Sequence, residues 1–112
     1  ARAQVTEGMS LTSGFKTALS EYYADNGVFP TLAIVGGTTS GKYVNDIVFN
    51  NVIGGTIAVT ATFRTSGIAA QIAGDTFTLA TVDGGKTWKC GNDQSLYTTN
   101  QVGTNFLPSA CK

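Results

Sequence analysis

General acid–base chemistry in this chain would have to rest on its seven carboxylate side chains, because the sequence contains no histidine. These residues are Glu7, Glu21, Asp25, Asp46, Asp75, Asp83 and Asp93. Several adjoin glycine or asparagine, as turn residues do, and no nucleophilic side chain has an obvious activating base. We therefore predict that these carboxylates form turns or carry solvated charge, and that the protein is not an enzyme.

Two cysteines, Cys90 and Cys111, lie 21 positions apart. A metal or redox site would need further soft ligands or a CxxC spacing, and the chain has neither. We predict one structural disulfide between them, of the kind that forms in an oxidising compartment such as the periplasm or the cell exterior. We also predict that the chain holds no metal and no cofactor.

Two segments rich in glycine raise the question of ligand binding. Residues 36–41 could suggest a phosphate-binding loop, but they do not join a strand to a helix, so a surface loop is the better interpretation. Asp83-Gly84-Gly85 together with Asp93 could suggest a calcium loop, which needs several oxygen ligands in order. A hairpin turn explains Asp83-Gly84-Gly85 more simply.

The charge balance does not support nucleic-acid binding. Seven basic and seven acidic residues cancel, and they are scattered along the chain, whereas nucleic acids and anionic membranes attract clusters of basic residues. Lys86, Trp88 and Lys89 come nearest to a basic aromatic patch. Two lysines release few counterions, so we expect Trp88 to lie in the core beside Cys90 instead.

A helical pattern covers residues 1–25. At about 100° per residue, its apolar side chains share one face: Val5, Met9, Leu11, Phe15, Ala18, Leu19, Tyr22 and Tyr23. Glu7 and Glu21 lie off this face. Asp25-Asn26-Gly27 should end the helix with a glycine cap, and Pro30 should prevent it from resuming.

Beyond a loop at residues 26–42, the sequence alternates between apolar and polar side chains, as strands do. We expect strands at residues 43–49, 56–63, 76–82 and 86–90. In the second strand, Ile57, Val59, Ala61 and Phe63 should point inward and the threonines outward. The pattern predicts a single α+β domain over residues 1–112, in which one amphipathic helix packs on a four-stranded antiparallel sheet at residues 43–90.

The predicted disulfide would close a polar loop over residues 90–111. The side chains of this loop suit contact with sugars or surfaces through hydrogen bonds and ring stacking: Asp93, Tyr97, Thr98, Thr99, Asn100, Gln101 and Asn105. Alternatively, the loop closes the edge of the sheet and packs between neighbouring molecules. The sequence leaves both interpretations open.

Five short motifs follow one another in the order seen in type IV pilins: ARAQVTEG (1–8), EYYADNGVFP (21–30), GKYV (41–44), WKC (88–90) and FLPSAC (106–111). Over almost its whole length the chain resembles a type IVa major pilin of Gram-negative gammaproteobacteria such as Pseudomonas and Acinetobacter. Residues 26–42 resemble the segment that is called the αβ-loop in that family.

The resemblance implies a subunit that polymerises with identical copies into retractable surface filaments, which serve twitching motility, adhesion, biofilm formation and DNA uptake. The helix would pack inside the filament through Val5, Met9, Phe15, Leu19 and Tyr22. The family has a preceding hydrophobic half-helix, methylated after leader cleavage, that holds the subunit in the inner membrane beside the pilus assembly machinery. Its removal would explain the uncapped start at Ala1. Host-cell glycans or abiotic surfaces would be the external partners.

Other identities agree with part of the pattern. Within the family, a minor pilin or a type II secretion pseudopilin would share the helix and the sheet, although pseudopilins usually lack the disulfide-bonded loop. From a different class, a small secreted carbohydrate-binding domain would share the composition. That alternative predicts an ordinary signal peptide and glycan binding by the isolated domain.

Overall fold

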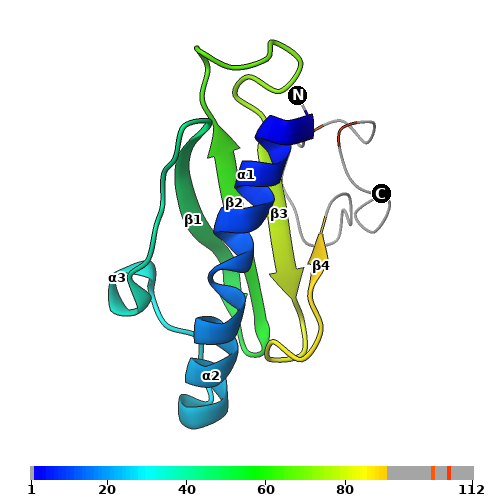
Figure 1. The fold of residues 1–112 in the computed structure, drawn as a ribbon. Coiled ribbons are helices and arrows are strands. Elements are labelled where there is room, and N and C mark those ends of the chain that lie inside the picture. Colours follow the sequence, from blue (N-terminus) through cyan, green and yellow to red (C-terminus); the bar gives the residue numbers. More distant parts are fainter. Residues whose placement is uncertain (1, 91–101, 103–105, 107–112) are drawn as a thin grey trace.

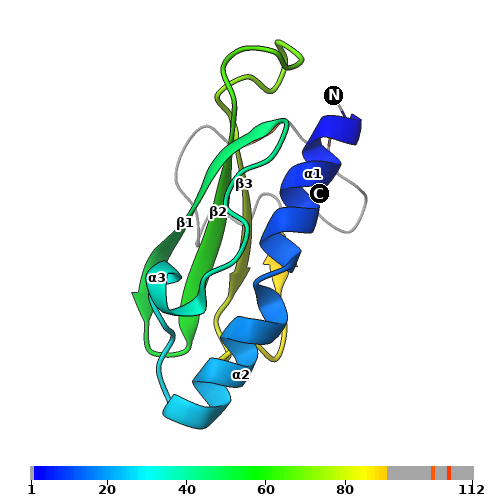
Figure 2. The same cartoon turned by 60° about the vertical axis from the view of Figure 1, so that its left-hand side comes forward.

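The computed structural model describes residues 2–90, 102 and 106. Within these residues the chain forms a helical N-terminal part followed by a four-stranded sheet (Figure 1). The elements are α1 (Arg2–Ser13), α2 (Lys16–Asn26), α3 (Leu32–Val35), β1 (Val44–Ile53), β2 (Thr56–Phe63), β3 (Thr76–Thr81) and β4 (Lys89–Cys90). Figures 1 and 2 show α1 lying along one face of the sheet and α2 extending beyond the ends of the strands. The predicted α+β architecture is confirmed.

The prediction of one continuous helix was wrong at Gly14 and Phe15, which separate α1 from α2. The Phe15 N–H donates to the carbonyl of Thr12 instead of residue 11, and the regular pattern resumes only with the Leu19 N–H on the Phe15 carbonyl. Glycine is a weak helix former. In addition, the buried Thr12 hydroxyl bonds back to the carbonyl of Gly8, a contact that tends to bend helices.

The predicted stop is confirmed, because Gly27 is left-handed (φ 73°) and its N–H donates to the Tyr23 carbonyl. The αβ-loop (26–42) was predicted to lack regular structure, but it contains α3. This helix is a single turn, closed by the Gly36 N–H on the Leu32 carbonyl.

The sheet is antiparallel throughout, with its strands in chain order from β1 to β4. Strand β2 has the predicted bounds, and β3 ends one residue before the predicted bound. Strand β1 runs to Ile53, four residues further than predicted, because it pairs with β2 up to the hairpin. Strand β4 begins at Lys89 instead of residue 86, since the preceding residues belong to the turn that follows β3.

The core lies between the helices and the sheet. Each of the largest fully buried side chains belongs to a helix, a strand or the loop between β2 and β3: Val5, Thr12, Leu19, Val44, Ile47, Ile57, Val59, Phe63, Ile72 and Thr81. Trp88 and Cys90 are half-buried and pack against this core, as predicted. No helix in the described part of the chain is both long and apolar enough to span a membrane.

The threonines of β2 were predicted to point outward, on the face away from the helices. Instead Thr60 and Thr78 are buried, and their hydroxyls lie 3.2 Å apart in a hydrogen bond. The Asn50 side chain extends this row to β1 by donating to the Thr60 hydroxyl. Paired hydroxyls and amides satisfy one another, so their burial does not leave polar groups without partners.

Candidate functional site

Glu7 is not the solvated charge that the sequence predicted. Its half-buried carboxylate accepts the backbone N–H groups of Tyr43 (2.8 Å) and Val44 (2.9 Å) with a single oxygen, Oε1. A helix residue thereby holds the start of β1. The sequence analysis considered only contacts between the apolar face of the helix and the sheet. In the structure, the segment that leads into β1 also contacts α1, through Glu7.

Arg64 holds the same turn from the other side. Its Nε and Nη2 atoms donate to the Gly41 carbonyl at 3.2 and 2.9 Å, and its own N–H donates to the Tyr43 carbonyl. Glu7 therefore binds the N–H groups of the turn at residues 41–44, and Arg64 binds its carbonyls. Hydrogen bonds to charged groups are stronger than neutral ones, so this turn is held firmly.

The spacing from Gly36 to Lys42 matches the GxxxxGK part of a phosphate-binding loop, but Tyr43 stands where serine or threonine would follow. The segment leads into β1 and not into a helix, so no helix N-terminus faces a phosphate there. The Lys42 Nζ lies 5.4 Å from the centre of the Tyr43 ring. The interpretation of residues 36–41 as a surface loop therefore stands.

Asp83 organises the turn after β3, as predicted. Its carboxylate accepts hydrogen bonds from the side chains of Thr81 and Thr87 and from the Thr87 N–H. These hydrogen bonds hold the pKa of Asp83 well below its ordinary value, and those from Thr87 are the largest cause. Both carboxylate oxygens accept hydrogen bonds from residues of the same turn. This argues against the alternative that Asp83 belongs to a calcium-binding loop.

The lowered pKa of Asp83 predicts a pH dependence of stability. A carboxyl group whose pKa is lower in the folded state stabilises the protein above its unfolded pKa of about 4, and this contribution is lost as the pH falls. We expect the free energy of unfolding of Asp83→Ala to fall less between neutral pH and acid than that of the wild type. Urea unfolding at several pH values measures both slopes. Asp25→Ala is the control, and equal slopes for Asp83→Ala and the wild type would contradict the prediction.

The remaining carboxylates form no common site. Burial raises the pKa of Asp75, whereas Glu21, Asp25 and Asp46 are exposed, and Asp93 lies outside the described residues. Among the residues that the structure describes, no three side chains of histidine, cysteine, aspartate or glutamate gather where they could hold a metal ion.

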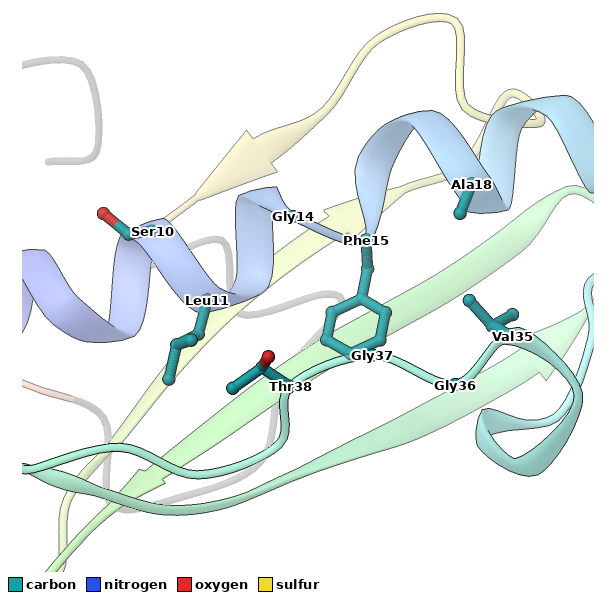
Figure 3. A pocket seen from close by; sticks show the side chains of 9 residues that line it. All are labelled: Ser10, Leu11, Gly14, Phe15, Ala18, Val35, Gly36, Gly37 and Thr38. Atoms are coloured by element: carbon teal, nitrogen blue, oxygen red, sulfur yellow. The ribbon is translucent and has the colours of Figure 1, made fainter.

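A groove of about 310 Å³ lies where the helix breaks, between the helices and the αβ-loop (Figure 3). Leu11, Phe15 and Ala18 line it from the helical side, and the Phe15 ring points at Gly37 on the other side. A Cβ atom on Gly37 would lie 3.0 Å from this ring, so the loop passes as close as glycine permits. The Phe15 ring therefore reaches from the helix break to the αβ-loop side of the groove.

Exposed apolar side chains also occur in the αβ-loop, at the end of β1, and at Val48 and Val82. Val28 and Ile34 belong to the αβ-loop, and Ile34 is 61% exposed. Val52 and Ile53 lie at the end of β1, beside the tight turn into β2, and Ile53 is 77% exposed. Exposed aliphatic side chains of this kind are typical of surfaces that contact other molecules.

The residues predicted to pack the helix inside a filament differ in their burial. Val5, Phe15 and Leu19 are buried within the domain itself, so they are not available to a second molecule. Met9 and Tyr22 are half-buried, and Met9 lines a small groove with Arg2, Thr6 and Phe106. A contact between copies through Met9 and Tyr22 stays a prediction.

The predicted contact residues of the C-terminal loop all lie outside the described residues: Asp93, Tyr97, Thr98, Thr99, Asn100, Gln101 and Asn105. Cys90 ends β4, and its predicted partner Cys111 also lies outside them. The pairing of the two cysteines and the contact role of this loop therefore stay predictions.

Comparison with known proteins shows one family. The model of the pilin family, a bacterial filament, matches residues 1–112. Fimbrial protein EcpC of Eikenella corrodens is 35% identical, over the whole of this chain and 71% of its own length. A type IV major pilin protein PilE1 of Neisseria gonorrhoeae is 32% identical over the whole chain and 70% of its own length. A fimbrial protein of Neisseria meningitidis is 34% identical over the whole chain and 76% of its own length.

The match extends over both structural layers, from the helix that carries Glu7 to the segment that carries the second cysteine. Exposed aliphatic side chains are typical of surfaces that contact other molecules, and the pilin family is a family of structural proteins. The chain belongs to the pilin family of bacterial filament proteins.

Proposed function

We propose that this chain is the major structural subunit of a type IV pilus. The observation that carries the proposal is that relatives named as type IV major pilins align with the entire chain at 32% identity. The whole chain, residues 1–112, would act as a single pilin domain. It would be moved by separate motor proteins and would catalyse no reaction itself.

The principal partner would be a second copy of the same chain. Outside the core-facing stripe, the helices expose mainly small side chains, among them Ala3, Thr6, Ser10, Ser13 and Thr17. Small side chains let two helices approach closely, so this exposed face supports packing of helices from neighbouring subunits. Because Val5, Phe15 and Leu19 are buried by the subunit's own sheet, the filament contact would use this face together with Met9 and Tyr22.

The assembled filament would lie outside the cell, after an inner-membrane stage at which the pilus assembly machinery takes up the subunit. It would serve twitching motility, adhesion and biofilm formation, with host-cell glycans or abiotic surfaces bound through the C-terminal loop. DNA uptake would not depend on charge attraction by this subunit alone, because its basic and acidic residues balance.

Deletion of the gene, followed by electron microscopy with antibody labelling, tests this function. We expect the deletion strain to lack surface filaments, and the antibody to label complemented filaments along their whole length. Sparse labelling at the tips would instead indicate a minor pilin. Intact filaments in the deletion strain would contradict the proposal and favour a pseudopilin or a secreted carbohydrate-binding domain.

A further inference from the structure

The helices reach three separate loops with one polar side chain each. Gln4 accepts the N–H of Ala69 in the β2–β3 loop at 2.9 Å, and the Ser20 hydroxyl donates to the Gly85 carbonyl in the β3–β4 turn at 3.1 Å. Glu7 makes the corresponding contact where the αβ-loop passes into β1, at Tyr43 and Val44. Of the three side chains, only Glu7 is charged and makes two of these bonds. The bonds from Glu7 join residues 36 and 37 positions apart in the chain.

Gly41 indicates that the chain is built around this carboxylate. A Cβ atom at Gly41 would lie 2.5 Å from Glu7 Oε1 and 2.8 Å from Glu7 Cδ, which is closer than side chains tolerate. Gly41 is not among the glycines with positive φ, so the backbone conformation does not explain the residue type. The space needed by the Glu7 carboxylate does.

The turn at residues 41–44 is where the αβ-loop joins the rigid sheet. Figure 2 shows the loop passing from α3 along the sheet before it turns back into β1. At the far end of the loop, Gly27 caps α2. Between these two attachments, residues 35–38 form one wall of the groove at the helix break. The position of that wall, and of the exposed Ile34, therefore depends on how the turn at residues 41–44 is held.

We propose that Glu7 is the positioning residue that fixes the αβ-loop in the placement required for filament assembly. This inference rests on the proposed function. Removing the carboxylate would leave the N–H groups of Tyr43 and Val44 without an acceptor, and Val44 is fully buried. The sheet, the core and the bonds from Arg64 would remain, but the turn at residues 41–44 and the groove wall next to it would lose their attachment to α1.

Glu7→Ala, Glu7→Gln and Gly41→Ala test this role in the full chain. We expect Glu7→Ala to accelerate amide hydrogen exchange at Tyr43 and Val44 by about tenfold to a hundredfold, and to cause a loss of surface filaments in complemented cells. Gly41→Ala should have the same two effects, because it displaces the carboxylate. Glu7→Gln should preserve both properties, since its amide oxygen can accept the same two N–H groups.

Glu21→Ala is the matched control, because it removes an exposed carboxylate from the same helical segment. It should change neither exchange at Tyr43 and Val44 nor filament number. Filament numbers near those of the wild type for Gly41→Ala, despite faster exchange, would overturn the proposal even if Glu7→Ala failed to fold. A lack of filaments in cells complemented with the wild type would instead count against the proposed function.

Discussion

Replacing Phe15 by alanine is expected to lower the free energy of unfolding by about 3–5 kcal/mol, the usual cost of deleting a buried aromatic ring. The Phe15 side chain is 3% exposed. Its ring meets that of Phe49 edge-on, with the ring centres 5.5 Å apart and the planes at 88°. This geometry adds to the stabilisation that burial provides. The ring also contacts Gly37, so its loss would remove the contact between the helix break and the αβ-loop.

Urea unfolding of the purified chain measures this effect. Phe15→Leu keeps most of the apolar volume and should cost less than about half as much. Thr17→Ala, which changes an exposed side chain two residues away, should stay within about 0.5 kcal/mol of the wild type. A loss below about 1 kcal/mol for Phe15→Ala would mean that the ring does not anchor the helix break, since the cavity cost would be absent.

Substitutions at the contact between Gly8 and Phe63 are expected to lower the free energy of unfolding. Phe63 is 1% exposed, and Phe63→Ala should cost about 3–5 kcal/mol. Gly8 is buried, and a Cβ atom there would lie 2.8 Å from Phe63 Cζ. Alanine favours a helix interior over glycine by about 1 kcal/mol, but overpacking a filled core costs about 1–3 kcal/mol. We therefore expect Gly8→Ala to be net destabilising.

A double-mutant cycle separates the gain in helix propensity at residue 8 from the cost of overpacking against Phe63. In a Phe63→Leu background the shorter side chain leaves room for a methyl group, so Gly8→Ala should cost less there than in the wild type, or even stabilise. Gly14→Ala is the control, because a Cβ atom at this exposed position would meet only backbone carbonyl oxygens. Equal effects of Gly8→Ala in both backgrounds would show that the ring is not what excludes a side chain at residue 8.

The candidate site was less predictable than the fold. The turn at Asp83 could be predicted because its bonds join residues at most four positions apart, within the range that local sequence patterns describe. The role of Glu7 could not, because its partners lie 36 and 37 positions away and are backbone N–H groups, which leave no mark on side-chain patterns. One signal was available in the sequence, since a glycine, Gly41, stands two residues before the predicted strand at residues 43–49.

The sequence by itself determined the order of helix and strands, the glycine cap at Gly27, the turn at Asp83 and the family, because these depend on local periodicity, short-range hydrogen bonds and motif order. Only the tertiary structure decided that the helix breaks at Phe15, that Gly8 makes room for Phe63, and that Glu7 holds the αβ-loop. Each of these features depends on residues that are distant in the sequence and come close only after folding. They supply hydrogen-bond donors or limit the available space, and a local sequence pattern contains no information about them.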